Sequence, residues 1–188
     1  MKYPKNCIMT FSQVLMDPFD IRPEQIRIED IAHSLSLMTR ANGHLFQFFS
    51  VAQHSINCAL EAASRGLGRR VQLACLMHDA AEAYIADIPR PVKHRLNGFA
   101  EIEEKISDAV FAKYGLSDLS DEETAAVAAI DDAMLHAEFD ALMGIQIFDI
   151  APTVSMSHDF RLRDMRDVDN QFIRLFNSLI ADPENKAI

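Results

Sequence analysis

The feature that most constrains the fold is a succession of helical hydrophobic patterns. In each segment apolar side chains recur every three or four residues, the spacing that places them on one face of an α-helix. The segments cover about residues 29–38, 51–66, 69–84, 99–114, 121–143 and 164–180. Extended chain is indicated only near residues 8–16, as a short β-hairpin or an arm. We therefore predict an all-α, single-domain helical bundle.

Several boundaries of these helices can be identified from local signals. Ser120 followed by Glu123 is a capping box, which opens the helix expected to run to about residue 143. Gly115 directly follows the segment 99–114, and glycine is favoured just past a helix end. Residues 145–163 show little periodicity, so we expect a long loop there. The 188 residues contain no internal repeat and no long linker, which suits one domain spanning 1–188.

Composition and charge exclude some functions. The net charge of −10 repels phosphate polymers, so we expect no nucleic-acid partner. No apolar run reaches the ~18 residues of a membrane helix, and the amino terminus lacks a signal-peptide pattern. The three cysteines, Cys7, Cys58 and Cys75, form no C-x-x-C pair and are typical of thiols in a reducing compartment. We expect a soluble, cytoplasmic protein without a membrane partner.

One stretch carries an unusual density of ionisable groups. An apolar run leads into the adjacent pair His78-Asp79, and carboxylates follow at Glu82 and Asp87. If residues 69–84 are one helix, then His78, Asp79 and Glu82 lie within one turn. Placing such a set at the end of an apolar helix is costly unless the groups are paired or bind a metal.

Three other acids and bases complete a constellation. His54 belongs to the preceding predicted helix, and Asp131 and Asp132 lie in the middle of the long one. One histidine, a His-Asp pair and a distant aspartate can close around a single divalent cation. Imidazoles and carboxylates suit Mn²⁺, Fe²⁺, Co²⁺ or Zn²⁺. At this point either Asp131 or Asp132 could be the fourth ligand.

The pattern His54, His78-Asp79 and Asp131 resembles the His…His-Asp…Asp signature of the HD-domain metal-dependent phosphohydrolases. The closest resemblance is to bacterial deoxynucleoside 5′-monophosphatases and related nucleotide hydrolases, over about residues 26–140. These enzymes place a Glu four residues and an Asp nine residues beyond the His of the pair, here Glu82 and Asp87. They carry an Arg about 14 or 15 residues before the first ligand, here Arg40. Their ligand Asp is followed by a Glu seven residues later, which favours Asp131 over Asp132.

The resemblance implies an HD-type bundle, an activity and a set of roles. His54, His78, Asp79 and Asp131 would bind one divalent metal ion, Mn, Co, Fe, Mg or Zn. Glu82 and Asp87 would be the catalytic acids, one protonating the leaving oxygen and the other positioning water, in an order that is left open. The residues expected to bind substrate are Arg40, Lys93 and His44.

The substrate implied is a small phosphorylated molecule, foremost a deoxynucleoside 5′-monophosphate. One alternative is a dNTP triphosphohydrolase that uses the same metal site. A second, from another class, is a non-catalytic HD-like module for nucleotide sensing or protein interaction. By analogy with the family, a homodimer is also expected.

Overall fold

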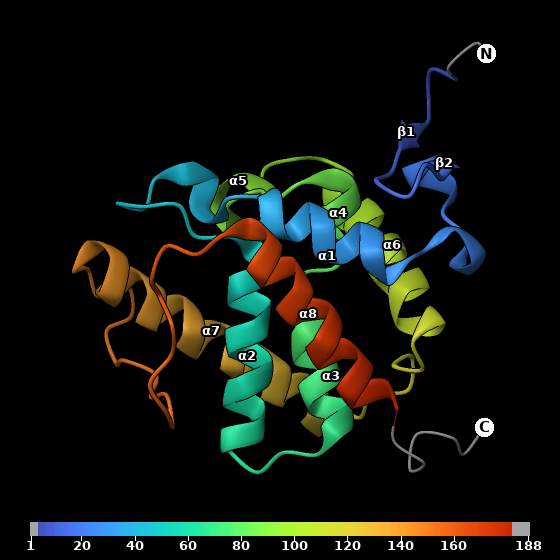
Figure 1. Cartoon of the computed structure of the whole chain (residues 1–188). Coiled ribbons are helices and arrows are strands. Elements are labelled where there is room, and N and C mark those ends of the chain that lie inside the picture. Colours follow the sequence, from blue (N-terminus) through green and yellow to red (C-terminus); the bar gives the residue numbers. More distant parts are fainter. Residues whose placement is uncertain (1–3, 182–188) are drawn as a thin grey trace.

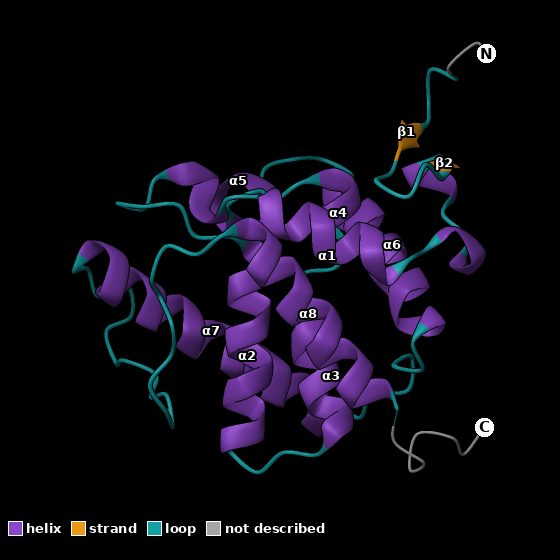
Figure 2. Ribbon diagram, viewed as in Figure 1, coloured by secondary structure: helices purple, strands orange, loops and turns teal. Residues whose placement is uncertain are grey.

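The computed structural model, which describes residues 4–181, confirms an all-α fold with a short N-terminal hairpin (Figures 1 and 2). In the hairpin, β1 (Ile8–Met9) pairs antiparallel with β2 (Leu15–Met16). The helices are α1 (Ile28–Leu37), α2 (Val51–Ser64), α3 (Arg69–Met77), α4 (Glu82–Ile85), α5 (Arg90–Lys93), α6 (Phe99–Lys113), α7 (Asp121–Met143) and α8 (Met165–Ile180). Short 3₁₀ turns are η1 (Pro18–Asp20), η2 (Pro23–Gln25) and η3 (Arg40–Gly43).

Helix α2 lies at the centre of the bundle. It packs against α3, which runs beside it, and is also in contact with α1, α7 and α8 (Figure 1). Its small side chains Ala52, Cys58, Ala59 and Ala62 are buried and let the neighbouring helices approach closely. His54, the candidate site residue on this helix, is therefore enclosed by the surrounding helices.

The long loop predicted at 145–163 forms neither helix nor strand, as expected. It is nevertheless fixed to α2, because three buried polar residues on one stripe of that helix bind its backbone. Gln53 and Asn57 donate to the carbonyl oxygens of Arg161 and Asp159, at 3.1 and 3.3 Å. Glu61 accepts the backbone N–H of Ser155 at 2.7 Å. Burying both faces of α2 thus requires the loop as well as the core.

The prediction of one continuous helix over residues 69–84 is wrong. Helix α3 ends at Met77, residues 78–81 form a turn, and α4 begins at Glu82. Backbone bonds here close over three residues, as from Ala80 N to Met77 O at 3.0 Å and from Glu82 N to Asp79 O at 3.0 Å. The tighter turn changes the direction in which His78 and Asp79 point. The ring nitrogen Nδ1 of His78 lies 2.8 Å from the carbonyl oxygen of Cys75. Propensity favours a helix through this segment, but the site's contacts override it.

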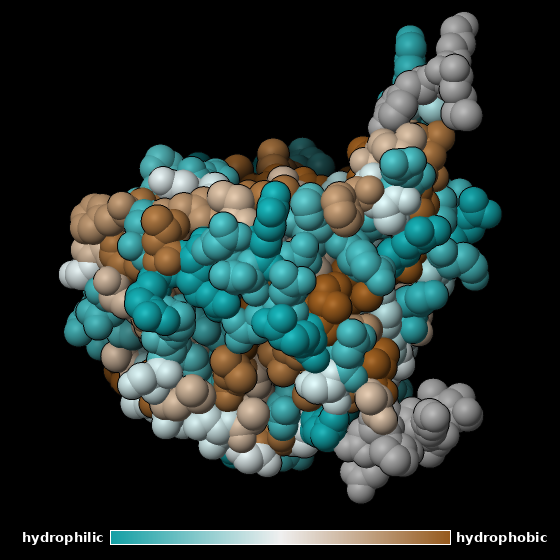
Figure 3. Space-filling model, in the orientation of Figure 1, coloured by the Kyte–Doolittle hydropathy of each residue, from teal (hydrophilic) through white to brown (hydrophobic). Residues whose placement is uncertain are grey.

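The capping box at Ser120 and Glu123 and the predicted end of α7 at Met143 are confirmed. The last predicted helix is α8, where Met165 of the first turn is 41% exposed and Val168, Phe172, Phe176 and Leu179 are buried. Hydrophilic side chains cover much of the face shown in Figure 3, with apolar patches between them. Among residues 4–181, no helix is long and apolar enough to cross a lipid bilayer.

Candidate metal centre

Donor atoms of four side chains, which come from three parts of the fold, lie close together. His54 Nε2, on α2, lies 3.2 Å from His78 Nε2 and 3.2 Å from Asp131 Oδ1 on α7. His78 Nε2 lies 3.3 Å from Asp79 Oδ1 and 3.7 Å from Asp131 Oδ1. Nitrogen and oxygen ligands about 2.0–2.2 Å from one ion lie about 3.0–3.6 Å from one another. The spacing of these donors therefore fits a single metal ion.

The outer nitrogens of both imidazoles are held by acceptors. His54 Nδ1 lies 2.6 Å from Glu138 Oε1, and His78 Nδ1 donates to the Cys75 carbonyl at 2.8 Å. A carbonyl oxygen only accepts, so the proton of a neutral His78 belongs on Nδ1, and its Nε2 presents a lone pair to the centre. Such carboxylate and carbonyl partners are the usual supports of metal-binding histidines. In the sequence Glu138 is marked only by its spacing of seven residues from Asp131, and its contact with His54 is not predicted.

A cysteine also lies beside the centre. Cys58 Sγ is 3.5 Å from His54 Nε2, and His54, Cys58 and His78 form a group that could hold a metal ion. Burial raises the pKa of the Cys58 thiol, which favours the neutral form. A thiol must lose its proton to bind a metal ion, whereas Asp79 and Asp131 are already ionised without one. We therefore treat the two carboxylates as the main partners of the imidazoles.

The charges around the centre keep these carboxylates deprotonated. In the metal-free site, burial alone would raise the pKa of Asp131, but hydrogen bonds from the protonated imidazoles of His54 and His78 lower it well below its usual range. Burial likewise opposes ionisation of Asp79, and the charges of His78 and Arg40 outweigh it, so that its pKa is lowered. Ionised oxygens at this point are what a divalent cation requires.

Arg40 is held in place by a strained turn and two acids. Ala41 and Asn42 both adopt φ of +51°, and Gly43 follows at +75°, a run that turns the chain sharply after Arg40. Non-glycine residues in this region are strained and are concentrated at functional sites. Arg40 Nη1 binds Asp79 at 3.1 Å, and its Nε lies 3.6 Å from Glu138. Other N–H groups of the guanidinium remain for a substrate, since it carries five donors.

Glu82 and Asp87 lie on the same side of the site and differ in their surroundings. Glu82 is 4% exposed, and its Oε2 has no hydrogen-bond partner within residues 4–181. Burial, followed by the charges of Asp79 and Asp87, raises the pKa of Glu82 to about 10. Burial also raises the pKa of Asp87, while the backbone N–H of Ala41 donates to its carboxylate. Glu82 is thus the group that carries a proton at neutral pH.

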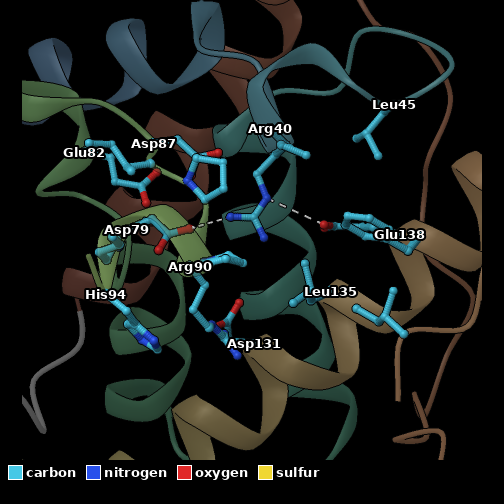
Figure 4. A pocket seen from close by; sticks show the side chains of 17 residues that line it. Arg40, Leu45, Asp79, Glu82, Asp87, Arg90, His94, Asp131, Leu135 and Glu138 are labelled. Carbon is cyan, nitrogen blue, oxygen red and sulfur yellow. Dashed lines mark hydrogen bonds and ion pairs between the residues drawn. The ribbon is translucent and has the colours of Figure 1, made fainter. Parts of the chain in front are cut away.

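A cavity of about 410 Å³ opens onto these groups (Figure 4). Of the predicted site residues, Arg40, Asp79, Glu82, Asp87, Lys93 and Asp131 line it. His54 is fully buried and His78 nearly so, which places both imidazoles behind the cavity wall. His44 is exposed at the end of η3 and does not line the cavity, because the left-handed turn carries it outward. The structure therefore gives no geometric support to His44 as a substrate contact.

The basic residues on the cavity's α5 wall are already paired. Lys93 Nζ binds Glu103 at 2.6 Å. Arg90 binds Asp131 Oδ2 at 3.2 Å and Asp132 Oδ1 at 3.1 Å. Asp132 is thus at the rim with Arg90, and Asp131 reaches both Arg90 and the imidazoles. This arrangement agrees with the preference for Asp131 as the inner aspartate.

Comparisons with known proteins give relatives without a described activity. No family model matches the chain. It is 43% identical over 109 residues to the uncharacterized protein YfdR of Escherichia coli K12, covering 58% of each chain. It is 38% identical over 106 residues to the uncharacterized protein RCAP_rcc00048 of Rhodobacter capsulatus, covering 54% of each chain. The chain thus matches between half and three fifths of the length of these relatives.

Proposed function

We propose that this protein is an HD-type, metal-dependent phosphohydrolase that cleaves a small phosphate monoester, foremost a deoxynucleoside 5′-monophosphate. The observation that carries the proposal is the close approach of His54 and His78 to each other and to Asp79 and Asp131, with these donor atoms 3.2–3.7 Å apart. The two aspartates line the cavity, and the imidazoles lie behind its wall. The two acids and the arginine expected beside such a site line the same cavity.

Each group has a role that its surroundings support. A divalent ion held by the four ligands would act as a Lewis acid toward the phosphate and favour ionisation of water. Arg40, whose pKa stays above its usual value because the charges of Glu138 and Asp79 outweigh burial, would orient the phosphate. Glu82, whose pKa is raised to about 10 by burial and by the charges of Asp79 and Asp87, would donate a proton to the leaving oxygen. Asp87 would then orient the attacking water and accept its proton. The higher pKa of Glu82 supports this choice between two roles that the sequence leaves exchangeable.

The charges at the cavity favour one phosphate group over three. A triphosphate requires several cations that can turn toward it. Here Lys93 is bound to Glu103, and Arg90 is bound to Asp131 and Asp132. Recruiting either residue would break an existing ion pair, so we rank the dNTP triphosphohydrolase second.

The proposal is tested by metal analysis and phosphate release on the purified chain. We expect stoichiometric divalent metal and turnover of at least one deoxynucleoside monophosphate, in a panel of dNMPs, NMPs and dNTPs with Mn²⁺, Co²⁺ and Mg²⁺. Asp131→Ala should lose bound metal and lower turnover by at least about 10³-fold, since a ligand is removed. The neighbouring Asp132→Ala is the matched control and should keep both.

Two results would speak against the proposal. Equal metal content in Asp131→Ala and wild type would reject the ligand assignment. Stoichiometric metal without turnover of any nucleotide in the panel would favour the non-catalytic module.

A further inference from the structure

One side of the cavity is apolar, and it begins next to the metal ligands. On α7, Asp131, Leu135 and Phe139 recur every four residues, so they share one face of the helix. Leu135 and Phe139 both line the cavity, together with Leu45 and Ile147 from the flanking loops. In Figure 4, Leu45 and Leu135 lie on one side of Arg40, and Asp79, Glu82 and Asp87 lie on the other. A molecule bound at Arg40 and Asp131 would therefore extend along an apolar wall.

Part of the wall lies outside the apolar core, although Leu45 belongs to the small core cluster. Leu135 is half-buried, yet within residues 4–181 it belongs to neither apolar core cluster nor to the side chains packed on them. Phe139 is also half-buried and packs against the small cluster of Leu45, Phe49 and Leu142. That packing holds the ring in one place. An apolar surface that faces a cavity, with one ring fixed from behind, is suited to a ligand.

We propose that the wall formed by Leu45, Leu135, Phe139 and Ile147 binds a planar aromatic ring in the leaving group of the substrate. The inference rests on the proposed function, because it takes the phosphate to lie at Arg40 and the metal ligands. An aromatic ring stacks on Phe139 and covers the branched side chains, which removes apolar surface from water. A nucleobase is such a ring, and a sugar phosphate without a base would leave the wall exposed.

The chemistry of the wall also determines how strongly it can discriminate between different bases. These four side chains have no hydrogen-bonding groups, so they recognise the flat shape of a ring and not its edge. Stacking of this kind tolerates every base, since each has a π-face. The site should therefore bind purine and pyrimidine nucleotides with affinities within about tenfold of one another.

The test compares two ligands that differ only in the ring. Non-hydrolysable phosphonate analogues of deoxyadenosine 5′-monophosphate and of its base-free 1,2-dideoxyribose phosphate are titrated by calorimetry into the full chain with Mn²⁺ bound, so that the metal site stays intact and no turnover occurs. We expect the nucleotide to bind about tenfold more tightly, as one stacked base contributes. Leu135→Asn and Phe139→Leu should reduce that advantage to about threefold or less. Phe139→Leu keeps an apolar side chain on the small cluster, which protects the fold. Phe19→Ala, on the exposed ring of η1, is the control and should keep the full advantage.

The outcomes separate this inference from the proposed function. Equal binding of the two ligands to wild type, or a tenfold advantage that survives in both variants, overturns the aromatic subsite. Phosphate release from deoxyadenosine 5′-monophosphate is measured on the same Mn²⁺-loaded proteins. A binding advantage that the variants lose, without phosphate release from wild type, would leave the subsite standing and reject the hydrolase.

Discussion

Asp131 and Asp132 are adjacent residues with different environments. Successive residues of an α-helix point in different directions, because one turn takes 3.6 residues. Asp131 directs Oδ1 to His54 at 3.2 Å, and Asp132 binds Arg90 near the surface. The side chain of Asp132 is 40% exposed, against 24% for Asp131. A position on the helix face, and not the residue type, decides which aspartate can take part in a metal site.

Glu82 gives a prediction about pH at the same scale. Its pKa in the folded protein is about 10, against an ordinary 4.5. Between these values the folded state holds a proton that the unfolded chain has released, so stability falls as pH rises through this window. In metal-free protein, Glu82→Gln removes the ionisable group and should raise the free energy of unfolding at pH 8 by on the order of 1–3 kcal/mol.

Urea unfolding at pH 5 and pH 8 checks this prediction. The difference between Glu82→Gln and wild type should be small at pH 5 and grow toward pH 8. Glu104→Gln, at an exposed position of α6, is the control and should shift neither value. A difference that is constant with pH would mean that Glu82 is not protonated in the folded state.

At the scale of elements, the structure of residues 145–163 depends on α2. Glu61 is fully buried and accepts from Ser155 at 2.7 Å, from Arg65 at 2.7 Å and from His158 at 2.8 Å. Despite the burial, these hydrogen bonds lower the pKa of Glu61 to about 2. The ionised carboxylate thus connects the loop to the central helix, and Ile147 of that loop lines the cavity.

Glu61→Ala should therefore loosen the loop more than it changes the helices. It removes the acceptor of three hydrogen bonds and leaves buried donors unpaired, which costs about 2–4 kcal/mol. Hydrogen exchange should show faster exchange at residues 153–161, with α3 and α7 less affected. Asp159→Ala removes the exposed pair with Arg161 and serves as the milder control. Equal exchange rates in the loop for Glu61→Ala and wild type would contradict the role of Glu61.

At the scale of the whole molecule, the sequence predicted the helices well and the turns within the site less well. Hydrophobic spacing and the capping box located α2, α6, α7 and α8, because long amphipathic helices repeat one signal over several turns. The break at residues 78–81 was not predicted, since Ala80, Ala81 and the preceding Leu76 favour helix and only tertiary contacts decide otherwise.

The candidate site shows the same division. The sequence motif predicts that His54, His78, Asp79 and Asp131 belong to one site. In the structure the donor atoms of these residues are close enough to one another for one ion. Glu138 could not be assigned as the partner of His54 from sequence, because that contact joins α7 to α2 across 84 residues. The position of Leu135 and Phe139 on the cavity wall could not be predicted from the sequence either, since apolar residues at helical spacing are usually in the core.

The site connects separate parts of the bundle, and that predicts how metal affects the stability of the whole protein. His54 comes from α2, His78 and Asp79 from the turn after α3, and Asp131 from α7. An ion bound by all four stabilises the folded state alone, by about 2.7 kcal/mol at a hundredfold excess over Kd. For a chain of this size that corresponds to a rise in Tm of about 5–10 °C.

Thermal unfolding with and without Mn²⁺ or Co²⁺ measures the shift. Asp131→Ala should lose most of it, and Cys58→Ala should keep it if the carboxylates, and not the thiol, complete the site. A shift lost in Cys58→Ala and kept in Asp131→Ala would instead assign the ion to His54, Cys58 and His78.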